Sequence, residues 1–367
     1  MNILVTGADG FIGKNLCFKF IENGYKNILR ICRESSEKDI RKNLERADII
    51  YHLAGVNRPE NESDFEEGNA VLTENIINKL LDLKKDVPIL FTSSSQAEES
   101  NAYGKSKLKA ENTIKRYGDV TGAKYYIYRL PNVFGKWCKP NYNSFIATFC
   151  FNLSRKIPIE IRDPNSSVNL VYIDDVCSEF LSLVEMKKEA GYHYVEKVHK
   201  TSVGKVADLL KKFKQSRDSL ITEDVGLGLQ RALYSTYLSY FEKKDFHYKL
   251  KGYEDDRGIF CEFIKTKASG QFSFFTALPG ITRGSHYHHS KSEKFLVLQG
   301  RAKFKFEHMI NNDKHVIETD SSELKVVESI PGWAHNIQNI GKGKLIVMLW
   351  ANEIFDRDNP DTISNTL

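Results

Sequence analysis

The sequence of 367 residues lacks the features that mark membrane, nucleic-acid-binding and secreted proteins. No apolar run approaches the roughly 18 residues that a membrane-spanning helix needs, so we expect no membrane insertion. The net charge of +5 comes without a dense block of Lys and Arg, which argues against nucleic-acid binding. The chain passes from Met1 directly into an apolar run and a glycine turn, which leaves no room for a signal peptide and predicts a cytoplasmic protein.

Cysteine is sparse, and no two cysteines form a C-x-x-C pair. Without a secretion signal, such scattered cysteines are expected to be reduced and mostly buried. Internal repeats and low-complexity tracts are also missing from the sequence. A chain of this length and ordinary composition is therefore expected to fold into two or three globular domains.

The first part of the chain alternates short apolar runs with longer helical patterns. This alternation is typical of βαβ units and predicts a Rossmann-type, doubly wound parallel sheet over residues 1–245. The expected strands are 3–5, 28–31, 49–53, 89–92 and 125–128, and the clearest helices are 72–83 and 102–117.

The pattern changes near residue 245. Strand-like runs separated by Gly, Pro, Asn and Asp then dominate, which is typical of an all-β barrel or sandwich. We therefore predict a second, all-β domain over residues 246–367. Its expected strands are 258–265, 271–278, 293–298, 302–307, 324–329 and 343–350.

A glycine turn close to the N-terminus predicts nucleotide binding. Gly7 permits a tight turn after the first strand, Gly10 lets the backbone approach a pyrophosphate, and Gly13 lets the following helix pack closely on the strand. A strand before the turn and a helix after it are the context that this fingerprint requires. The cofactor-binding residues expected from the turn are Gly7, Asp9, Gly10, Phe11, Ile12 and Gly13.

The end of the second strand bears on the choice of nicotinamide cofactor. NAD-binding sheets usually carry Asp or Glu there, and NADP-binding sheets carry Arg near the ribose 2′-phosphate. Arg33 occupies this place and favours NADPH, although Glu34 would favour NAD if the strand ended one residue later.

Tyr103 and Lys107 lie four residues apart in a predicted helix and share one face of it. A nearby ammonium lowers the pKa of a tyrosine and makes it a usable general acid. A run of serines ends the preceding strand, where a hydroxyl group can orient a carbonyl. We therefore predict Ser95, Tyr103 and Lys107 as catalytic residues, with Ser94 as the alternative serine.

A series of motifs over residues 6–176 resembles the extended short-chain dehydrogenase/reductase family, and the last two resemble its nucleotide-sugar members. The resemblance implies that Tyr103 protonates the substrate oxygen, that Lys107 binds the nicotinamide ribose, and that Ser95 positions the carbonyl. It also implies that Leu53, Ala54, Gly55 and Asn132 contact the cofactor. The motifs are Thr6-Gly7-x-x-Gly10-Phe11-Ile12-Gly13, Asp48-x-x-x-His52-Leu53-Ala54-Gly55, Ser93-Ser94-Ser95, Tyr103-x-x-x-Lys107, Arg129-Leu-Pro-Asn132-Val-Phe-Gly135 and Val171-Tyr-Ile-Asp174-Asp175-Val.

Two departures from the family narrow the expected reaction. Its dehydratases carry an Asp-Glu pair just after the serine or threonine, whereas this chain has Gln96 and Ala97. Its 4-epimerases usually carry an acidic residue where Arg33 stands. Reduction of a keto-sugar by NADPH is the reaction that remains.

Histidines in the second domain follow the spacing of a metal-binding cupin, a jelly-roll barrel. Gly280, His286, His288, Glu293 and Gly300 have the separations of the first cupin motif, and His335 lies in a shortened second motif. Residues two apart on a strand face the same side, so His286 and His288 can point into a barrel together. Three imidazoles and a carboxylate suit a divalent transition metal. The predicted ligands are His286, His288, Glu293 and His335, and a register slip would exchange His288 for His289.

Zinc is the first choice for this metal, and manganese, iron and nickel are compatible with the same ligands. A metal here would either acidify a C–H bond beside a sugar carbonyl or be structural. Arg257 is a candidate for gripping a diphosphate. Tyr287, His308 and Lys294 are candidates for the proton-transfer base.

The whole chain resembles bifunctional enzymes of capsular polysaccharide synthesis, in which a short-chain reductase precedes a cupin. The resemblance implies a zinc-containing homodimer that makes UDP-N-acetyl-L-fucosamine from a UDP-4-keto-6-deoxy-amino-sugar. The cupin would epimerise C3 of a UDP-2-acetamido-2,6-dideoxy-4-hexulose, and the reductase would reduce the C4 ketone. In the alternative hypothesis only the reductase is active, and the cupin is a structural or dimerising module.

Overall fold

The computed structural model describes residues 1–185 and 188–365. The chain forms two compact units, of which the first comprises Met1–Leu210 and Arg231–Phe241. The second comprises Lys211–Gln230 and Glu242–Leu367. This division differs from a single break after residue 245, because Lys211–Gln230 and residues 242–245 belong to the second unit.

A six-stranded parallel sheet forms the centre of the first unit, as the alternating pattern predicted. Its strands are nearly continuous apolar runs because helices cover both faces of the sheet. In sheet order they are β2 (Ile28–Ile31), β1 (Ile3–Thr6), β3 (Ile49–His52), β4 (Ile89–Ser94), β5 (Tyr125–Leu130) and β8 (Gly191–His193).

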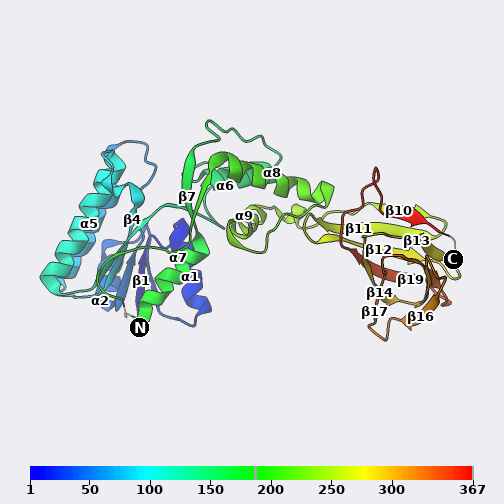
Figure 1. The fold of residues 1–367 in the computed structure, drawn as a ribbon. Coiled ribbons are helices and arrows are strands. Elements are labelled where there is room, and N and C mark those ends of the chain that lie inside the picture. The colour runs from blue at the N-terminus through cyan, green and yellow to red at the C-terminus, as the bar shows by residue number, and fades with distance from the viewer. Residues whose placement is uncertain (186–187, 366–367) are drawn as a thin grey trace. The chain divides into compact units, whose positions relative to one another are not determined.

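Helices pack on the two faces of this sheet (Figure 1). On one face, α1 (Phe11–Glu22) and α7 (Ile173–Ser182) bury Phe20 and Phe180 against Tyr51 of β3. The other face is covered by α2 (Glu37–Arg46), α4 (Leu72–Asp82) and α5 (Ala102–Thr121). The predicted doubly wound Rossmann-type fold is confirmed.

Further elements lie outside the central sheet, and those after Leu210 are divided between the two units. A second sheet has the order β6 (Asn132–Phe134), β7 (Ser167–Tyr172) and β9 (Val198–Ser202). The remaining helices are α3 (Ser63–Phe65), a π-helical segment (Glu66–Val71), short 3₁₀ turns (Ser95–Glu98, Leu183–Glu185 and Lys243–Asp245), α6 (Phe145–Ser154), α8 (Val203–Ser219) and α9 (Gly228–Leu238). No helix in the described ranges is long and apolar enough to cross a membrane.

Two antiparallel sheets form the second unit from Gly252 onward, and the all-β prediction for this part of the chain is confirmed. Their inner faces bury a shared core that includes Phe275 and Phe295 from one sheet and Phe304 and Ile337 from the other. The first sheet has the order β10 (Gly252–Asp255), β11 (Gly258–Thr266), β12 (Gly270–Ala277), β19 (Leu345–Ala351), β14 (Glu293–Gln299) and β17 (Val326–Glu328). The second has the order β16 (Lys314–Asp320), β15 (Arg301–His308), β18 (Trp333–Asn339), β13 (Thr282–Tyr287) and β20 (Ile363–Ser364).

Candidate functional sites

The glycine turn joins β1 to α1 as the sequence predicted. Gly7 has a φ of +66°, and its N–H donates to the carbonyl of Ile31 over 2.8 Å. A Cβ atom added at Gly13 would lie 2.2 Å from the carbonyl oxygen of Gly7, so only glycine lets the helix begin this close to the strand. The N-terminus of α1 therefore faces the space beyond β1, where backbone N–H groups and the helix dipole favour an anion.

A cavity of about 590 Å³ lies at the carboxyl ends of the parallel strands. Open parallel sheets bind their ligands at this edge. Ala54 and Arg33 are not among the described residues that line it. The lining contains the other residues predicted for the site, namely Gly7, Asp9, Gly10, Phe11, Ile12, Gly13, Leu53, Gly55, Ser95, Tyr103, Lys107 and Asn132.

Arg33 lies in the exposed turn that follows β2. The turn is closed by Cys32, whose N–H donates to the hydroxyl oxygen of Ser35 over 3.0 Å. Glu34 is exposed beside Arg33. The position at the end of the second strand is as expected, and the choice between NADPH and NADH stays a prediction.

The geometry favours Ser94, the alternative serine, as the partner of Tyr103. Ser94 is buried at the end of β4, whereas Ser95 is exposed. Burial raises the pKa of Tyr103, and a hydrogen bond with Ser94 offsets part of this effect. The Ser94 hydroxyl also accepts from the N–H of Gln96 over 3.2 Å, which fixes its direction at the strand end.

Lys107 lies one turn beyond Tyr103 on α5 and is buried. Its ammonium donates to the carbonyl oxygen of Thr92 over 3.0 Å and lies 4.9 Å from the centre of the Phe91 ring. Burial lowers the pKa of Lys107 to about 8, and the charge of Glu111 counteracts this effect. The net shift of the Tyr103 pKa is upward because of burial, so a lowering by Lys107 stays a prediction.

The buried carboxylate of Glu111, on the next turn of α5, links this helix to the central sheet through hydrogen bonds. Both oxygens of Glu111 accept from the Arg129 guanidinium, over 2.9 and 2.8 Å. Ser93 donates to one oxygen over 2.5 Å, and Tyr192 donates to the other over 2.8 Å. Burial would raise the pKa of Glu111, but these bonds outweigh it and hold the pKa below its ordinary value.

His52, from the second motif, connects three elements beside the cavity. Its ring nitrogens lie 2.7 Å from the Thr6 hydroxyl and 3.0 Å from the Thr73 hydroxyl. Complete burial lowers the pKa of His52 to about 3, so the ring is neutral at physiological pH. The Thr6 hydroxyl also accepts from the N–H of Ala54 over 3.2 Å. This hydrogen bond fixes the backbone of the loop after β3, and Ala54 is not among the described residues that line the cavity.

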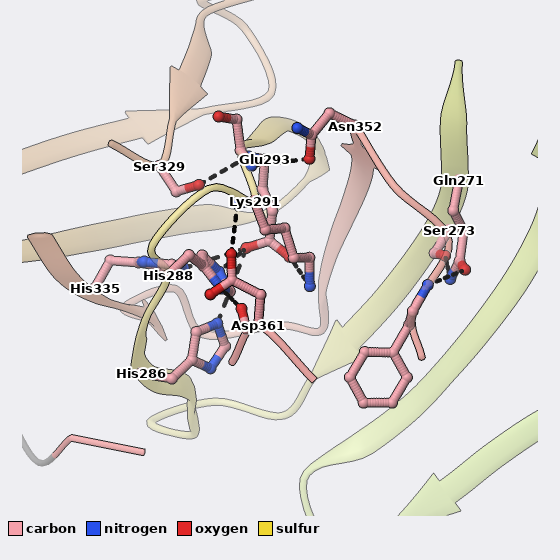
Figure 2. Close-up of polar contacts among 12 residues, drawn as sticks. Gln271, Ser273, His286, His288, Lys291, Glu293, Ser329, His335, Asn352 and Asp361 are labelled. Atoms are coloured by element: carbon pink, nitrogen blue, oxygen red, sulfur yellow. Dashed lines mark hydrogen bonds and ion pairs between the residues drawn. The ribbon is translucent and has the colours of Figure 1, made fainter. Parts of the chain in front are cut away.

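In the second unit, the four predicted metal ligands converge (Figure 2). One potential ligand atom from each of His286, His288, Glu293 and His335 lies within 4.8 Å of the others. Glu293 Oε2 is 3.9, 3.2 and 3.3 Å from the Nε2 atoms of His286, His288 and His335, respectively. His289 is exposed, with its ring against Tyr287, so the register with His288 inside is the one adopted.

The chemistry of this cluster fits a divalent metal. His286 Nε2 and His335 Nδ1 are buried and have no hydrogen-bond partner among the residues described. Burial would raise the pKa of Glu293, but the three neighbouring histidines and the charge of Lys291 outweigh this effect and lower the pKa. Neutral imidazoles around an ionised carboxylate are the forms that a transition metal binds.

Groups outside the cluster fix two of its members. His288 Nδ1 lies 2.5 Å from the carbonyl oxygen of Asp361, and the N–H of Glu293 donates to the Ser329 hydroxyl over 2.8 Å. The Asp361 carboxylate accepts from the N–H groups of His289, Ser290 and Lys291 over 2.7–2.8 Å. Figure 2 shows Asp361 beside the cluster, where it joins the C-terminal segment to the loop that carries His288. Such outer partners orient metal-binding side chains.

A cavity of about 290 Å³ opens onto the cluster. None of the three candidate bases, Tyr287, His308 and Lys294, is among the described residues that line it. Lys291 does line it, and its buried ammonium lies 3.1 Å from Glu293 Oε1.

Comparison with known proteins places the chain in a family. Residues 3–195, over half of the chain, match the NAD dependent epimerase/dehydratase family. The chain belongs to this family. Residues 253–363 match the polysaccharide biosynthesis C-terminal domain.

Two relatives are similar to this chain over both of its units. A UDP-2-acetamido-2,6-beta-L-arabino-hexul-4-ose reductase of Pseudomonas aeruginosa is 49% identical over 363 residues, 99% of this chain and 98% of that protein. The capsular polysaccharide assembling protein CapF from Staphylococcus aureus is 42% identical, with a TM-score of 0.92 over 100% of both chains. The expected resemblance to a capsular polysaccharide enzyme with two joined domains is confirmed.

A less similar solved structure matches only part of this chain and shares its fold there. UDP-glucuronic acid 4-epimerase from Bacillus cereus, solved with NAD, has a TM-score of 0.57 and 18% identity over 65% of this chain and 98% of that chain. At this identity the likeness shows the fold alone.

Sequence reasoning missed several residues of these sites. Glu111 lies four residues after Lys107, and this helical spacing was a usable signal. Lys291 lies between predicted ligands, which was a weaker signal. Asp361 reaches the loop at residues 289–291 from about 70 positions away, and no local pattern indicates such a contact.

Proposed function

We propose that the chain is a bifunctional enzyme of capsular polysaccharide synthesis. Its second unit epimerises C3 of a UDP-2-acetamido-2,6-dideoxy-4-hexulose at a divalent metal, with zinc as first choice. Its first unit then reduces the C4 ketone with NADPH, which leads to UDP-N-acetyl-L-fucosamine. The order follows from chemistry, since the ketone acidifies the neighbouring C3 proton and reduction removes the ketone.

The observation that carries the reductase proposal is the grouping of Ser94, Tyr103 and Lys107 in the cavity that the glycine turn also lines. These residues offer a general acid, a second hydroxyl donor and a cation at the site where the family binds its nicotinamide. The relative from Pseudomonas aeruginosa, described as a hexul-4-ose reductase, supports a keto-sugar substrate.

Each of the three residues has a role in carbonyl reduction. A bound nicotinamide supplies the hydride that reduces C4. Tyr103 donates a proton to the developing alkoxide oxygen, and Ser94 directs that oxygen through a hydrogen bond. The high pKa of Tyr103 that results from burial suits an acid that stays protonated until charge develops. Lys107, held by the Thr92 carbonyl, supplies positive charge beside the phenol and the cofactor ribose.

Arg33 supports NADPH as the reductant. Its exposed guanidinium at the end of β2 suits the 2′-phosphate of NADPH. We expect Arg33→Ala to raise the KM for NADPH about tenfold while leaving the KM for NADH nearly unchanged, because only NADPH carries that phosphate. Equal changes in the KM values for NADPH and NADH would contradict this role of Arg33.

The His286, His288, Glu293 and His335 cluster supports the epimerase proposal. A metal bound there would polarise the C4 carbonyl as a Lewis acid and so acidify the C3 proton. The adjoining cavity gives a sugar access to the cluster, which a purely structural site would not require.

One experiment tests both halves. The zinc-loaded protein is incubated in deuterated solvent with a UDP-4-keto-6-deoxy-N-acetylhexosamine, first without and then with NADPH. We expect exchange of the C3 proton without NADPH and loss of NADPH absorbance when it is added. A failure to oxidise NADPH with any 4-keto nucleotide sugar would rule out the reductase.

The variant His288→Ala separates the bifunctional enzyme from a reductase with a structural second unit. We expect it to lose C3 exchange and to retain reduction of a substrate that already has the product configuration at C3. Exchange at the wild-type rate in this variant would exclude metal-dependent epimerisation.

A further inference from the structure

Arg283 of β13 lines the same cavity as the metal cluster but contacts none of its four members through a hydrogen bond or ion pair that the described part of the chain contains. We propose that Arg283 makes this cavity a binding site for the diphosphate group of a nucleoside diphosphate sugar. The identity of the sugar rests on the proposed epimerase function. The binding site itself can be tested without turnover.

A β-bulge turns Arg283 toward the metal cluster. In the pairing of β13 with β18, Arg283 lies opposite Ile337 and His286 lies opposite His335, with a register shift between Gly284 and His286. Residues three apart on a regular strand point to opposite faces. Because the bulge absorbs Ser285, which has a φ of +67°, Arg283 and His286 oppose residues only two apart and share one face.

The guanidinium of Arg283 has an unused donor. Its Nε donates to the carbonyl of Thr276 over 2.9 Å, which anchors the side chain. Its Nη2 is buried without a hydrogen-bond partner in the described parts of the chain, and the Asp255 carboxylate oxygen is 3.6 Å away. A buried donor without a partner is costly, and a phosphate oxygen in the cavity would satisfy it with a charge-assisted bond.

The other two cations of the cavity are already engaged. Arg257 donates to the Asp255 carboxylate over 2.5 Å, and the Lys291 ammonium lies 3.1 Å from Glu293. Of the carboxylates that line the cavity, Glu262 pairs with a lysine, Lys265, over 3.0 Å. Arg283 differs from the other two cations because its buried Nη2 donates no hydrogen bond to the described residues, although the Asp255 carboxylate is 3.6 Å away. It is therefore a better candidate for the diphosphate than Arg257, which the sequence had indicated.

Arg283 and His286 share one face of β13, and both line the cavity together with Glu293 and His335. One ligand in this cavity can therefore meet both the guanidinium and the metal cluster.

The test is a count of UDP sites by equilibrium dialysis of labelled UDP against the zinc-loaded, full-length protein. We expect two UDP molecules per chain, one in each cavity, and one per chain for Arg283→Met. The matched control is Arg301→Met, which removes an exposed arginine of the same unit that pairs with Glu318. This control should retain two. A single site in the wild type, or two sites in Arg283→Met, would overturn the proposal.

A second variant covers the case in which Arg283→Met does not fold. Arg283→Lys keeps the charge and can still bond to Thr276, but it loses the forked geometry of the guanidinium. We expect its affinity for the second UDP to fall about tenfold, and an unchanged affinity would contradict the assignment. Because UDP cannot react, two sites without C3 exchange would reject the epimerase and keep this binding site. Exchange with one UDP site would reject only the binding site.

Discussion

The two candidate sites differ in how their buried polar groups are bonded. In the first unit, the Glu111 carboxylate receives hydrogen bonds from three side chains, and the Lys107 ammonium is held by a backbone carbonyl. In the second unit, buried nitrogens of His286, His335 and Arg283 lack a hydrogen-bond partner among the described residues.

This difference indicates which groups hold the side chains of each site in place. In the first unit, the protein alone holds α5 in place, because the buried charges of this helix are compensated within the protein. On the two proposals for the second unit, a bound metal would take the imidazole nitrogens and a bound phosphate would take the guanidinium donor. Changes in the first unit should therefore act on chemistry, whereas changes in the second should act on binding.

The largest expected effect comes from Tyr103→Phe. Loss of the general acid should slow NADPH oxidation about 10³-fold. Exchange of the C3 proton, measured by NMR in deuterated solvent, should stay at the wild-type rate because the proposal assigns this exchange to the second unit. A parallel loss of C3 exchange would contradict the assignment of the two reactions to separate units and show that they share a site.

The second largest effect on the reductase is expected from one of two matched serine variants. Ser94→Ala should lower kcat of the reductase about 10²-fold, because the buried hydroxyl beside Tyr103 no longer orients the carbonyl. Ser95→Ala changes an exposed neighbour and should alter kcat less than about twofold. Steady-state kinetics with the keto-sugar distinguish them, and the reverse ranking would return the role to Ser95.

In the second unit, Asp361→Ala should weaken zinc binding by about 10–100-fold while leaving NADPH oxidation unchanged. The Asp361 carboxylate orders the 289–291 loop, and its carbonyl lies beside the ligand His288. Competition with a chromophoric chelator measures the affinity, and Asp358→Asn in the same exposed segment is the control. Zinc affinity equal to that of the control would show that the loop holds His288 without Asp361.

The smallest effect concerns the pH dependence of the reductase. Lys107, with a pKa of about 8, is charged below this pH and loses its charge as the pH rises through it. The rate should therefore fall above about pH 8. The charge of Glu111 raises this pKa, so Glu111→Gln should move the basic limb of the kcat/KM profile to lower pH. A limb that stays in place would exclude Lys107 as its source.

Much of the first site could be predicted because its parts are local. The glycine turn lies within seven consecutive residues, and Tyr103 and Lys107 are one helical turn apart. Both patterns depend on the geometry of a single element, which the sequence shows directly. The choice between Ser94 and Ser95 was not local, since it depends on where β4 ends against α5.

In the second unit, the periodicity found β14, which carries Glu293, but missed β13 and β18, which carry His286 and His335. β13 and β18 contain these histidines together with Gly, Asn and Gln, so they do not read as apolar runs. The six strands that were expected lie within about two residues of their predicted bounds. Functional residues obscure the strand pattern because the interior they face is polar.

The sequence by itself determined the two fold classes, the nucleotide-binding turn, the Tyr103–Lys107 pair and the four candidate metal ligands. Each follows from periodicity or from a local spacing, and only His335 required a second motif further along the chain. Only the tertiary structure decided that Ser94 faces Tyr103, that Asp361 supports the His288 loop, and that Arg283 shares a face with His286. These contacts depend on a strand end, a chain return of about 70 residues and a bulge of one residue, and none of them leaves a periodic trace in the sequence.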